Sequence, residues 1–407
     1  MAITIKQSPQ KFTPSNNDII FQIESDSLNL IHFIAEIKDN TGLVISTLKL
    51  RPTPTYKKGV FFNLMRIIAA QTTVVKSDNI IEYIGDVIGY SVRLTTYANT
   101  DGFILPTGDE LVIGGLFAFN AQLPVDMFSS YAYTSYVANA SGVGRFLTSK
   151  PTQTDIAPVA TEYLYYINDA RANKIQFKFY YAAGTVVTKN VTIATSQKMG
   201  RINISPLVLE ATGTDLTDLK YYTVALLDSA NLIAIQPVFR NILKKPSISN
   251  VQMFWKNDLG GVDGYLFKNL RETINNTKIT ATGNSYKMNA AGLYSNNNAN
   301  IFNPTEINLQ SETTSTYTVV SEYLPTDEAR WITGIISSKQ VYVLLDNGKL
   351  FPVQVKDTGA TIQNTRYTGQ LNQFEFSFTA PSGVTGLSIQ TFTSEEYFPY
   401  TLPITLL

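Results

Sequence analysis

Few side chains in this sequence are suited to catalysis, and most of those are carboxylates. The chain has one histidine, His32, and no cysteine. Disulfides, thiolate catalysis and cysteine-ligated zinc are therefore excluded. A single imidazole also excludes any site that needs two and argues against Ser-His catalysis. His32 lies in the apolar run between Ile31 and Phe33, so we interpret it as a structural residue of a strand.

The carboxylates do not form a recognisable hydrolytic pair. A glycosidase holds two carboxyl groups roughly 5 to 9.5 Å apart. The neighbours Glu395 and Glu396 would face opposite sides of a strand. Asp327 and Glu328 are better explained as the acidic first turn of a helix. Three acids that are far apart in the sequence could still converge in the fold, which the sequence does not decide. They are Asp101, Asp263 and Asp357. We predict a non-enzymatic protein with no catalytic residues, and a polysaccharide hydrolase stays an open alternative.

The glycines and basic residues do not form a nucleotide or metal site. The run Gly142-Val-Gly-Arg lacks the third glycine of a dinucleotide loop, and no Gly-x-x-x-x-Gly-Lys-Ser/Thr occurs. The stretch Asp258 to Asp263 has only two carboxylates, too few for a calcium loop. Lys57-Lys58 and Lys244-Lys245 are short and typical of solvated loops. We predict no cofactor, no metal site and no nucleic-acid partner.

The overall composition is that of a chain with zero net charge and enough apolar residues for several cores. Its 407 residues correspond to about 2.7 domains of roughly 150 residues. Hydrophobic residues make up 44%, and 32 basic residues balance 32 acidic ones. No global field would attract nucleic acid or an anionic membrane. The longest apolar stretch, Leu111 to Phe119, is too short to span a bilayer, and the N-terminus lacks the pattern of a signal peptide.

Alternation of apolar and polar residues is the dominant pattern, which predicts a mainly β fold. Ile19 to Ile23, Phe33 to Ile37 and Ile175 to Phe179 alternate clearly. Asn347-Gly348 lies between the apolar runs Val341 to Leu345 and Leu350 to Val355, and this pattern predicts a hairpin.

Only two helices are expected. The stronger one covers about Thr326 to Ser337, with Thr326 as N-cap and an apolar face that includes Trp331 and Ile335. A weaker one covers Leu64 to Ala70. Short helices in a chain of this kind are decorations of β-rich modules.

An internal repeat in the first 245 residues predicts two related modules. Ile31 to Ile37 and Ile175 to Tyr181 are each followed by a glycine turn, a strand, a longer loop and a further strand. We interpret both as β-sandwiches of immunoglobulin or fibronectin-like type. The predicted organisation is a β-sandwich module (1–121), an extended connector or projecting loop (122–158), a second β-sandwich module (159–245) and a β-rich C-terminal domain with one short helix (246–407).

The connector is too aromatic for a solvated linker. It contains alternating tyrosines in a Ser/Ala-rich context, and tyrosine is enriched at interfaces. One face of an ordinary sheet is the alternative. We predict a contact with a neighbouring subunit through Phe128, Tyr131, Tyr133, Tyr136 and Phe146. We also expect that no module core depends on these tyrosines.

Two segments resemble virion proteins of tailed phages that infect Bacteroidota, including crAss-like phages. One is the opening Phe12-Thr-Pro-Ser-Asn-Asn-Asp-Ile-Ile-Phe with the later Leu50-Arg-Pro-Thr-Pro and Gly59-Val-Phe-Phe. The other is Phe254-Trp-Lys-Asn-Asp-Leu-Gly-Gly-Val-Asp-Gly-Tyr-Leu-Phe, in which Val262 stands where an aromatic would be expected. The block Leu324 to Phe378 also resembles the hub-like domains of tail proteins.

The resemblance implies a non-enzymatic structural component of a phage tail, collar, ring or baseplate, present in multiple copies. The implied partners are copies of itself and other tail, collar or portal-adaptor proteins. The implied location is the virion tail, after assembly in the host cytoplasm. The alternative is a tail fibre protein that binds a host receptor or glycan through Tyr and Trp faces, with the host surface as partner.

Overall fold

The computed structural model describes most of the chain, and the described part is mainly β with a few short helices. The described residues are 3–27, 29–53, 55–56, 58–69, 79–83, 87–196, 198–243, 250–282, 287–288, 290–295, 297–298, 301–302, 306–357, 372–381 and 386–392. None of the helices in these ranges is long and apolar enough to cross a membrane.

The N-terminal module is a sandwich of two sheets. One sheet has the order β1-β3-β6 and the other β2-β9-β8-β4-β5. Both contribute to one apolar core, in which Phe21 and Ile23 face Phe33 and Val92. Its elements are β1 (Ile3–Gln7), β2 (Phe12–Pro14), β3 (Ile20–Ser25), β4 (Leu30–Asp39), β5 (Val44–Leu50), β6 (Gly59–Asn63), α1 (Met65–Ile68), β8 (Val87–Thr100) and β9 (Phe103–Phe119).

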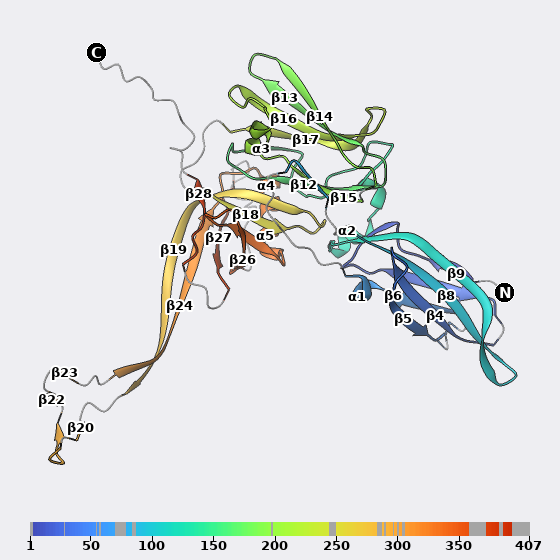
Figure 1. The fold of residues 1–407 in the computed structure, drawn as a ribbon, viewed down its shortest axis with the longest axis horizontal. Helices are drawn as coiled ribbons and strands as arrows, with labels where there is room; N and C mark the ends of the chain where they lie inside the picture. Colours follow the sequence, from blue (N-terminus) through green and yellow to red (C-terminus); the bar gives the residue numbers. More distant parts are fainter. Residues whose placement is uncertain are drawn as a thin grey trace, which may run out of the picture.

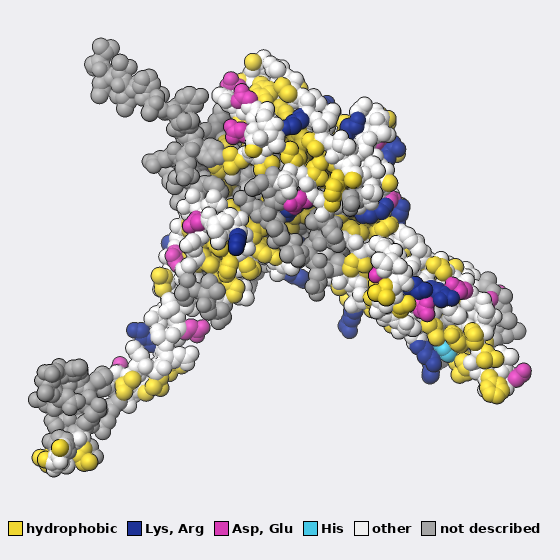
Figure 2. Space-filling view, viewed as in Figure 1, with side chains coloured by type: hydrophobic (Ala, Val, Ile, Leu, Met, Phe, Trp, Pro, Cys, Tyr) yellow, Lys and Arg dark blue, Asp and Glu magenta, His cyan; other side chains and the backbone are white. Residues whose placement is uncertain are grey.

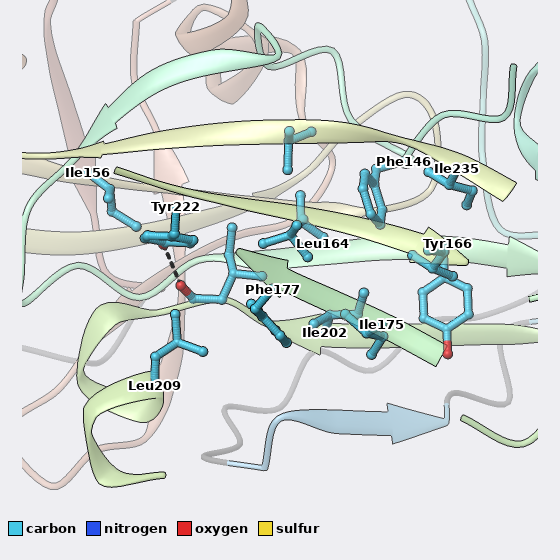
Figure 3. Close-up of a cluster of buried hydrophobic side chains, with 14 of the residues drawn as sticks. Phe146, Ile156, Leu164, Tyr166, Ile175, Phe177, Ile202, Leu209, Tyr222 and Ile235 are labelled. Carbon is cyan, nitrogen blue, oxygen red and sulfur yellow. Dashed lines mark hydrogen bonds between the residues drawn. The ribbon is translucent and has the colours of Figure 1, made fainter. Parts of the chain in front are cut away.

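The second module is also a two-sheet sandwich. Its sheets have the orders β10-β12-β15-β7 and β11-β17-β16-β13-β14. Figure 3 shows their shared core, which includes Phe177 and Tyr222. The Oη of Tyr222 donates a 2.6 Å hydrogen bond to the carbonyl of Ile204. The elements are β12 (Tyr163–Asn168), β13 (Lys174–Tyr181), β14 (Val186–Thr192), β15 (Met199–Asn203), α3 (Pro206–Ala211), β16 (Leu219–Leu227) and β17 (Ile233–Ile242).

The five-stranded sheets of the two modules share one topology, in agreement with the predicted repeat. In each five-stranded sheet the first strand pairs in parallel with its neighbour, and the remaining pairs are antiparallel. In each smaller sheet an antiparallel pair, β3–β6 or β12–β15, precedes a short helix, α1 or α3. The predicted alternation is confirmed by burial, since every second residue of β3 and of the central part of β13 is buried.

Two segments cross between the modules. β7 (Ile81–Tyr83) lies between α1 and β8 in the chain, yet it pairs with β15 of the second module. Residues 122–158 form a packed connector: after α2 (Val125–Ser129) and the turn η1 (Tyr133–Ser135), β10 (Val137–Ala138) pairs with β12, and β11 (Gln153–Ile156) pairs with β17. The connector therefore supplies strands to both sheets of the second module.

The C-terminal part contains a closed six-stranded sheet. β18 (Asn250–Lys256) pairs with β19 (Val262–Thr282) on one side and with β25 (Val341–Leu344) on the other. The remaining strands of the ring are β24 (Glu306–Val320), β26 (Leu350–Val355) and β27 (Glu375–Thr379), and β28 (Thr391–Phe392) also pairs with β18. Side chains such as Trp255, Phe267 and Phe376 fill the interior.

The predicted helix and hairpin of this domain are both present. The helix is divided into α4 (Thr326–Ile332) and α5 (Gly334–Ser337), and Trp331, Ile332 and Ile335 pack on the core of the closed sheet. The N-cap is Pro325, not Thr326 as predicted, and it makes no side-chain cap. The hairpin pairs Leu344 with Leu350 around Gly348, whose φ is 74°. The weaker predicted helix corresponds to α1.

The second module and the closed sheet form a body from which two projections extend (Figure 1). One projection is the N-terminal module. The other is the outer part of the β19–β24 hairpin, which extends beyond the closed sheet on the opposite side of the body. Short strands follow near its end: β20 (Lys287–Met288), β21 (Tyr294–Ser295), β22 (Asn297–Asn298) and β23 (Ile301–Phe302).

Candidate assembly surfaces and a buried ionic network

The outer hairpin, residues 271–282 and 306–315, is called the arm below. Within the arm its two strands pair with each other from Ile274–Ser315 to Thr282–Glu306, and among the described residues they pair with no other strand there, since the pairing of β24 with β27 ends at Thr316. Both strands therefore present a row of unpaired backbone groups. Open edges of this kind are templates for pairing with another chain.

The arm also exposes aliphatic side chains. Ile274, Ile279, Ile307 and Leu309 are all exposed, and hydrophobic atoms are visible along the projection in Figure 2. An isolated two-stranded ribbon is at best marginally stable in water. Within the described residues the arm has almost no buried side chain to stabilise it.

Of the five aromatic residues predicted as a subunit contact, two are buried and three are partly buried against residues of the same chain. Tyr131 is 8% exposed and Phe146 is 3% exposed. Phe128, Tyr133 and Tyr136 are partly buried against the cluster that contains Tyr131. The expectation that no core depends on these tyrosines is wrong, because the connector folds back onto the modules it joins. A contact of these five residues with a neighbouring subunit stays a prediction.

Tyr131 joins the connector to the N-terminal module. Its Oη donates a 2.8 Å hydrogen bond to the carbonyl of Phe12, and the contact is buried. The Tyr131 ring stacks on Tyr136 at 5.7 Å between ring centroids, and Tyr133 lies 6.0 Å from the ring of Phe12. Burial raises the pKa of Tyr131. This group of rings is an internal contact between the N-terminal module and the connector.

A buried ionic network lies where the connector, the second module and the closed sheet meet. Glu162 is its centre: Lys150 Nζ donates to Oε2 at 2.7 Å, and Arg240 Nε donates to Oε1 at 2.8 Å. All three side chains are buried. Burial alone would raise the pKa of Glu162, but the charges of Arg240 and Lys150 outweigh it and hold that pKa below its ordinary value.

Asp263 connects this network to the closed sheet. Thr148 Oγ1 donates to its Oδ1 at 2.7 Å, and Trp331 Nε1 donates to its Oδ2 at 2.8 Å. Lys150 Nζ lies 4.7 Å from the Trp331 ring centroid. Burial raises the pKa of Asp263, since no cation pairs with it directly within the described residues. The network holds its acids against basic or donor groups of the same chain, an arrangement suited to joining domains.

A cavity of about 480 Å³ lies beside this network, between the second module and the closed sheet. Its lining includes Asp155 and Glu328, and the exposed ring of Tyr323 stands at it. Burial, with a contribution from the charge of Asp155, raises the pKa of Glu328. The lining is part apolar and part charged, with the lysines Lys150 and Lys268 beside the acids, a composition suited to a small polar ligand.

The remaining candidate acids do not form one site. Asp101 lies in the turn between β8 and β9, and Asp263 lies at the start of β19. Asp357 follows β26 and accepts a hydrogen bond from the backbone of Ser377. Glu395 and Glu396 lie outside the described residues. Within the described part, no group of three or more His, Cys, Asp or Glu side chains could hold a metal.

His32 occupies a packed position on β4. It is buried and stacks on Tyr97 at 4.8 Å between ring centroids. Burial lowers its pKa. The side chain is thus a packed residue of the strand, in keeping with its position between Ile31 and Phe33.

Sequence reasoning missed both the arm and the ionic network. The arm had a signal: residues 271–282 are rich in Thr and Asn and lack the alternating apolar residues of a strand with a buried face, and residues 306–315 contain only two apolar residues, Ile307 and Leu309. The network had none, because Lys150, Glu162 and Arg240 come from three separate segments.

Comparisons with known proteins give no family. No protein-family model and no curated protein matches the chain. The crystal structure of CBD12 from CALX1.2 is 8% identical, covers 60% of this chain and 99% of that chain, and has a TM-score of 0.19. The crystal structure of the tetra-tandem repeat in the extending region of a large adhesion protein is 10% identical. It covers 94% of this chain and 90% of that chain, and has a TM-score of 0.22. Such TM-scores carry no argument about fold or function.

Proposed function

We propose that this chain is a non-enzymatic structural protein of a phage tail, a collar, ring or baseplate component that assembles in multiple copies through its β-modules. The observation that carries the proposal is the arm. It exposes two unpaired strand edges and four aliphatic side chains and has no buried face along its length. A partner that pairs with these edges would satisfy the backbone groups and cover the apolar side chains.

Two further observations support the proposal. The buried acids Glu162 and Asp263 are engaged by groups of the same chain, which suits a structural role. The sequence patterns at Phe12 and Phe254 resemble those of phage virion proteins. Partners of this kind are copies of the chain itself and neighbouring tail, collar or portal-adaptor proteins, and the corresponding location is the virion.

Removal of the arm tests the proposal. Thr273 pairs with Thr316, which also pairs with Thr379 at the end of the closed sheet, so Asn-Gly can replace residues 274–315 and close the hairpin there. We expect the shortened chain to keep its thermal transition and to stay monomeric in sedimentation, while the full chain forms rings or higher oligomers visible by electron microscopy. A full chain that stays monomeric and is absent from particles would contradict the proposal.

A host-glycan-binding tail fibre is the second candidate, and the cavity favours it. Tyr323 offers an exposed ring beside the carboxylates of Glu328 and Asp155. Glycan arrays with the full chain test this candidate. Binding that is lost in Tyr323→Ala and in Glu328→Gln, but kept in Tyr83→Ala, would support it. Tyr83 is also exposed and lies on β7, outside this cavity.

A further inference from the structure

The smaller sheets of the two modules differ at both edges. At one edge, β1 pairs antiparallel with β3, whereas β10 pairs in parallel with β12. The other edge carries the difference that matters here. In the second module, β7 pairs with the outer edge of β15, and Arg201 on β15 forms an ion pair with Glu82 on β7. The corresponding strand of the N-terminal module is β6, which pairs with β3. Among the described residues no strand occupies the other edge of β6. The same position in the fold is thus covered in one module and open in the other.

The open edge of β6 lacks the usual protection against pairing. Edge strands are commonly guarded by charged residues, especially lysine. The outer strands β5 and β14 contain Lys49 and Lys189, but β6 contains no charged residue. Its central residue, Phe61, is 62% exposed. The edge of β6 is therefore the better acceptor for an added strand.

The outer half of β24 has matching features. Glu306 and Glu312 bound the uncharged segment 307–311, whose central residue, Leu309, is 67% exposed. Leu309 falls at the register shift between the pairs Ile279–Gln310 and Thr280–Asn308, so it has no partner on β19. Its side chain is available to a strand on the other edge.

The charges at the ends of the two segments are complementary. Lys58 precedes β6 and Arg66 follows it, and both are exposed. Glu306 and Glu312 are six residues apart, as are Lys58 and Leu64, which lies two residues before Arg66. Aligning the acidic with the basic ends, in parallel or antiparallel direction, places Leu309 opposite Phe61. An apolar cross-strand pair flanked by opposite charges stabilises strand pairing.

The arm and the N-terminal module lie on opposite sides of the body (Figure 1), so the two edges meet between copies. We propose that the outer half of β24 in one copy adds as a strand to β6 of a second copy, with Leu309 against Phe61. This inference rests on the proposed multi-copy assembly and names its surfaces. The contact is heterologous, so repetition generates a ring or a filament.

Disulfide trapping tests the contact directly, because the chain contains no cysteine. Full-length Phe61→Cys and Leu309→Cys chains are mixed, oxidised and analysed on non-reducing gels. We expect the mixed dimer as the main product. Two controls use matched exposed positions: Thr188→Cys on β14 in place of Phe61→Cys, and Ile274→Cys on β19 in place of Leu309→Cys.

The outcomes separate this contact from the proposed function. Oligomers of the wild-type chain together with equal or stronger trapping at Thr188→Cys would leave assembly standing and overturn the pairing of β24 with β6. A wild-type chain that stays monomeric, with no trapping at any position, would overturn both.

Charge exchange provides a second test. Glu306→Lys combined with Glu312→Lys should weaken association by about tenfold or more through like-charge repulsion. Adding Lys58→Glu and Arg66→Glu should restore it. Failure of the second pair to restore association, with both variants folded, would show that these charges do not meet.

Discussion

The indole Nε1 of Trp331 donates a 2.8 Å hydrogen bond to Oδ2 of Asp263, and both side chains are buried. Trp331 belongs to α4 and Asp263 to the start of strand β19, so this bond fixes the helix against the closed sheet. The same carboxylate accepts from Thr148 of the connector. One acid thus holds together the helix, the closed sheet and the connector.

Replacement of Trp331 with Phe should destabilise the closed-sheet domain. It removes a hydrogen bond to a buried carboxylate, which costs about 1.5 to 3 kcal/mol, in addition to lost packing. The chain has two tryptophans, so the fluorescence of Trp255, buried in the closed sheet, reports the unfolding of this domain.

A double-mutant cycle isolates the Trp331–Asp263 bond. The penalty of Trp331→Phe should be smaller in an Asp263→Asn background, because the carboxamide carries no charge that needs the donor. Equal penalties in both backgrounds would show that the effect is packing alone.

Replacement of Glu162 with Gln should strongly destabilise the junction of the second module and the closed sheet. It leaves the buried Arg240 and Lys150 without a counter-ion, and such a loss costs about 3 to 5 kcal/mol. Urea unfolding measures the change. Arg271→Gln is the control: its pair with Glu375 is 3.8 Å long and largely exposed, so we expect an effect below about 1 kcal/mol.

The stabilising effect of Glu162 should depend on pH. Its pKa is lower in the folded chain than its ordinary value of 4.5. Below that value the unfolded chain binds more protons than the folded chain, so the free energy of unfolding falls as the pH falls. The difference between wild type and Glu162→Gln should be constant near neutral pH and shrink as the pH drops below about 4.5. A difference that grows in acid would contradict the assigned ion pairs.

The tyrosines of the connector should matter for folding. Tyr131→Ala should cost about 3 to 5 kcal/mol, because it empties a packed site between connector and N-terminal module. Tyr131→Phe should cost about 1 kcal/mol for the lost hydrogen bond to Phe12. Thermal denaturation measures both. Tyr323→Ala is the control, because Tyr323 is exposed. A Tyr131→Ala chain as stable as the Tyr323→Ala chain would contradict the burial of Tyr131.

Local pattern was enough to predict much of the fold. Alternation of Ile175, Phe177 and Phe179 predicts a strand with one buried face, because side chains alternate across a strand. The Asn347-Gly348 turn predicts its hairpin, since glycine readily adopts the positive φ found there. The repeat between Ile31 and Ile175 predicts a shared topology because both segments place the same elements in the same order.

Only the tertiary structure decided where those elements meet. Lys150, Glu162 and Arg240 form one network although 90 residues of sequence separate the first from the last. No local pattern encodes a contact of that range. The pairing of β7 with the second module and the burial of Tyr131 were also beyond local pattern. A tyrosine suits a core as well as a surface, and its burial depends on the path of the connector between the two modules.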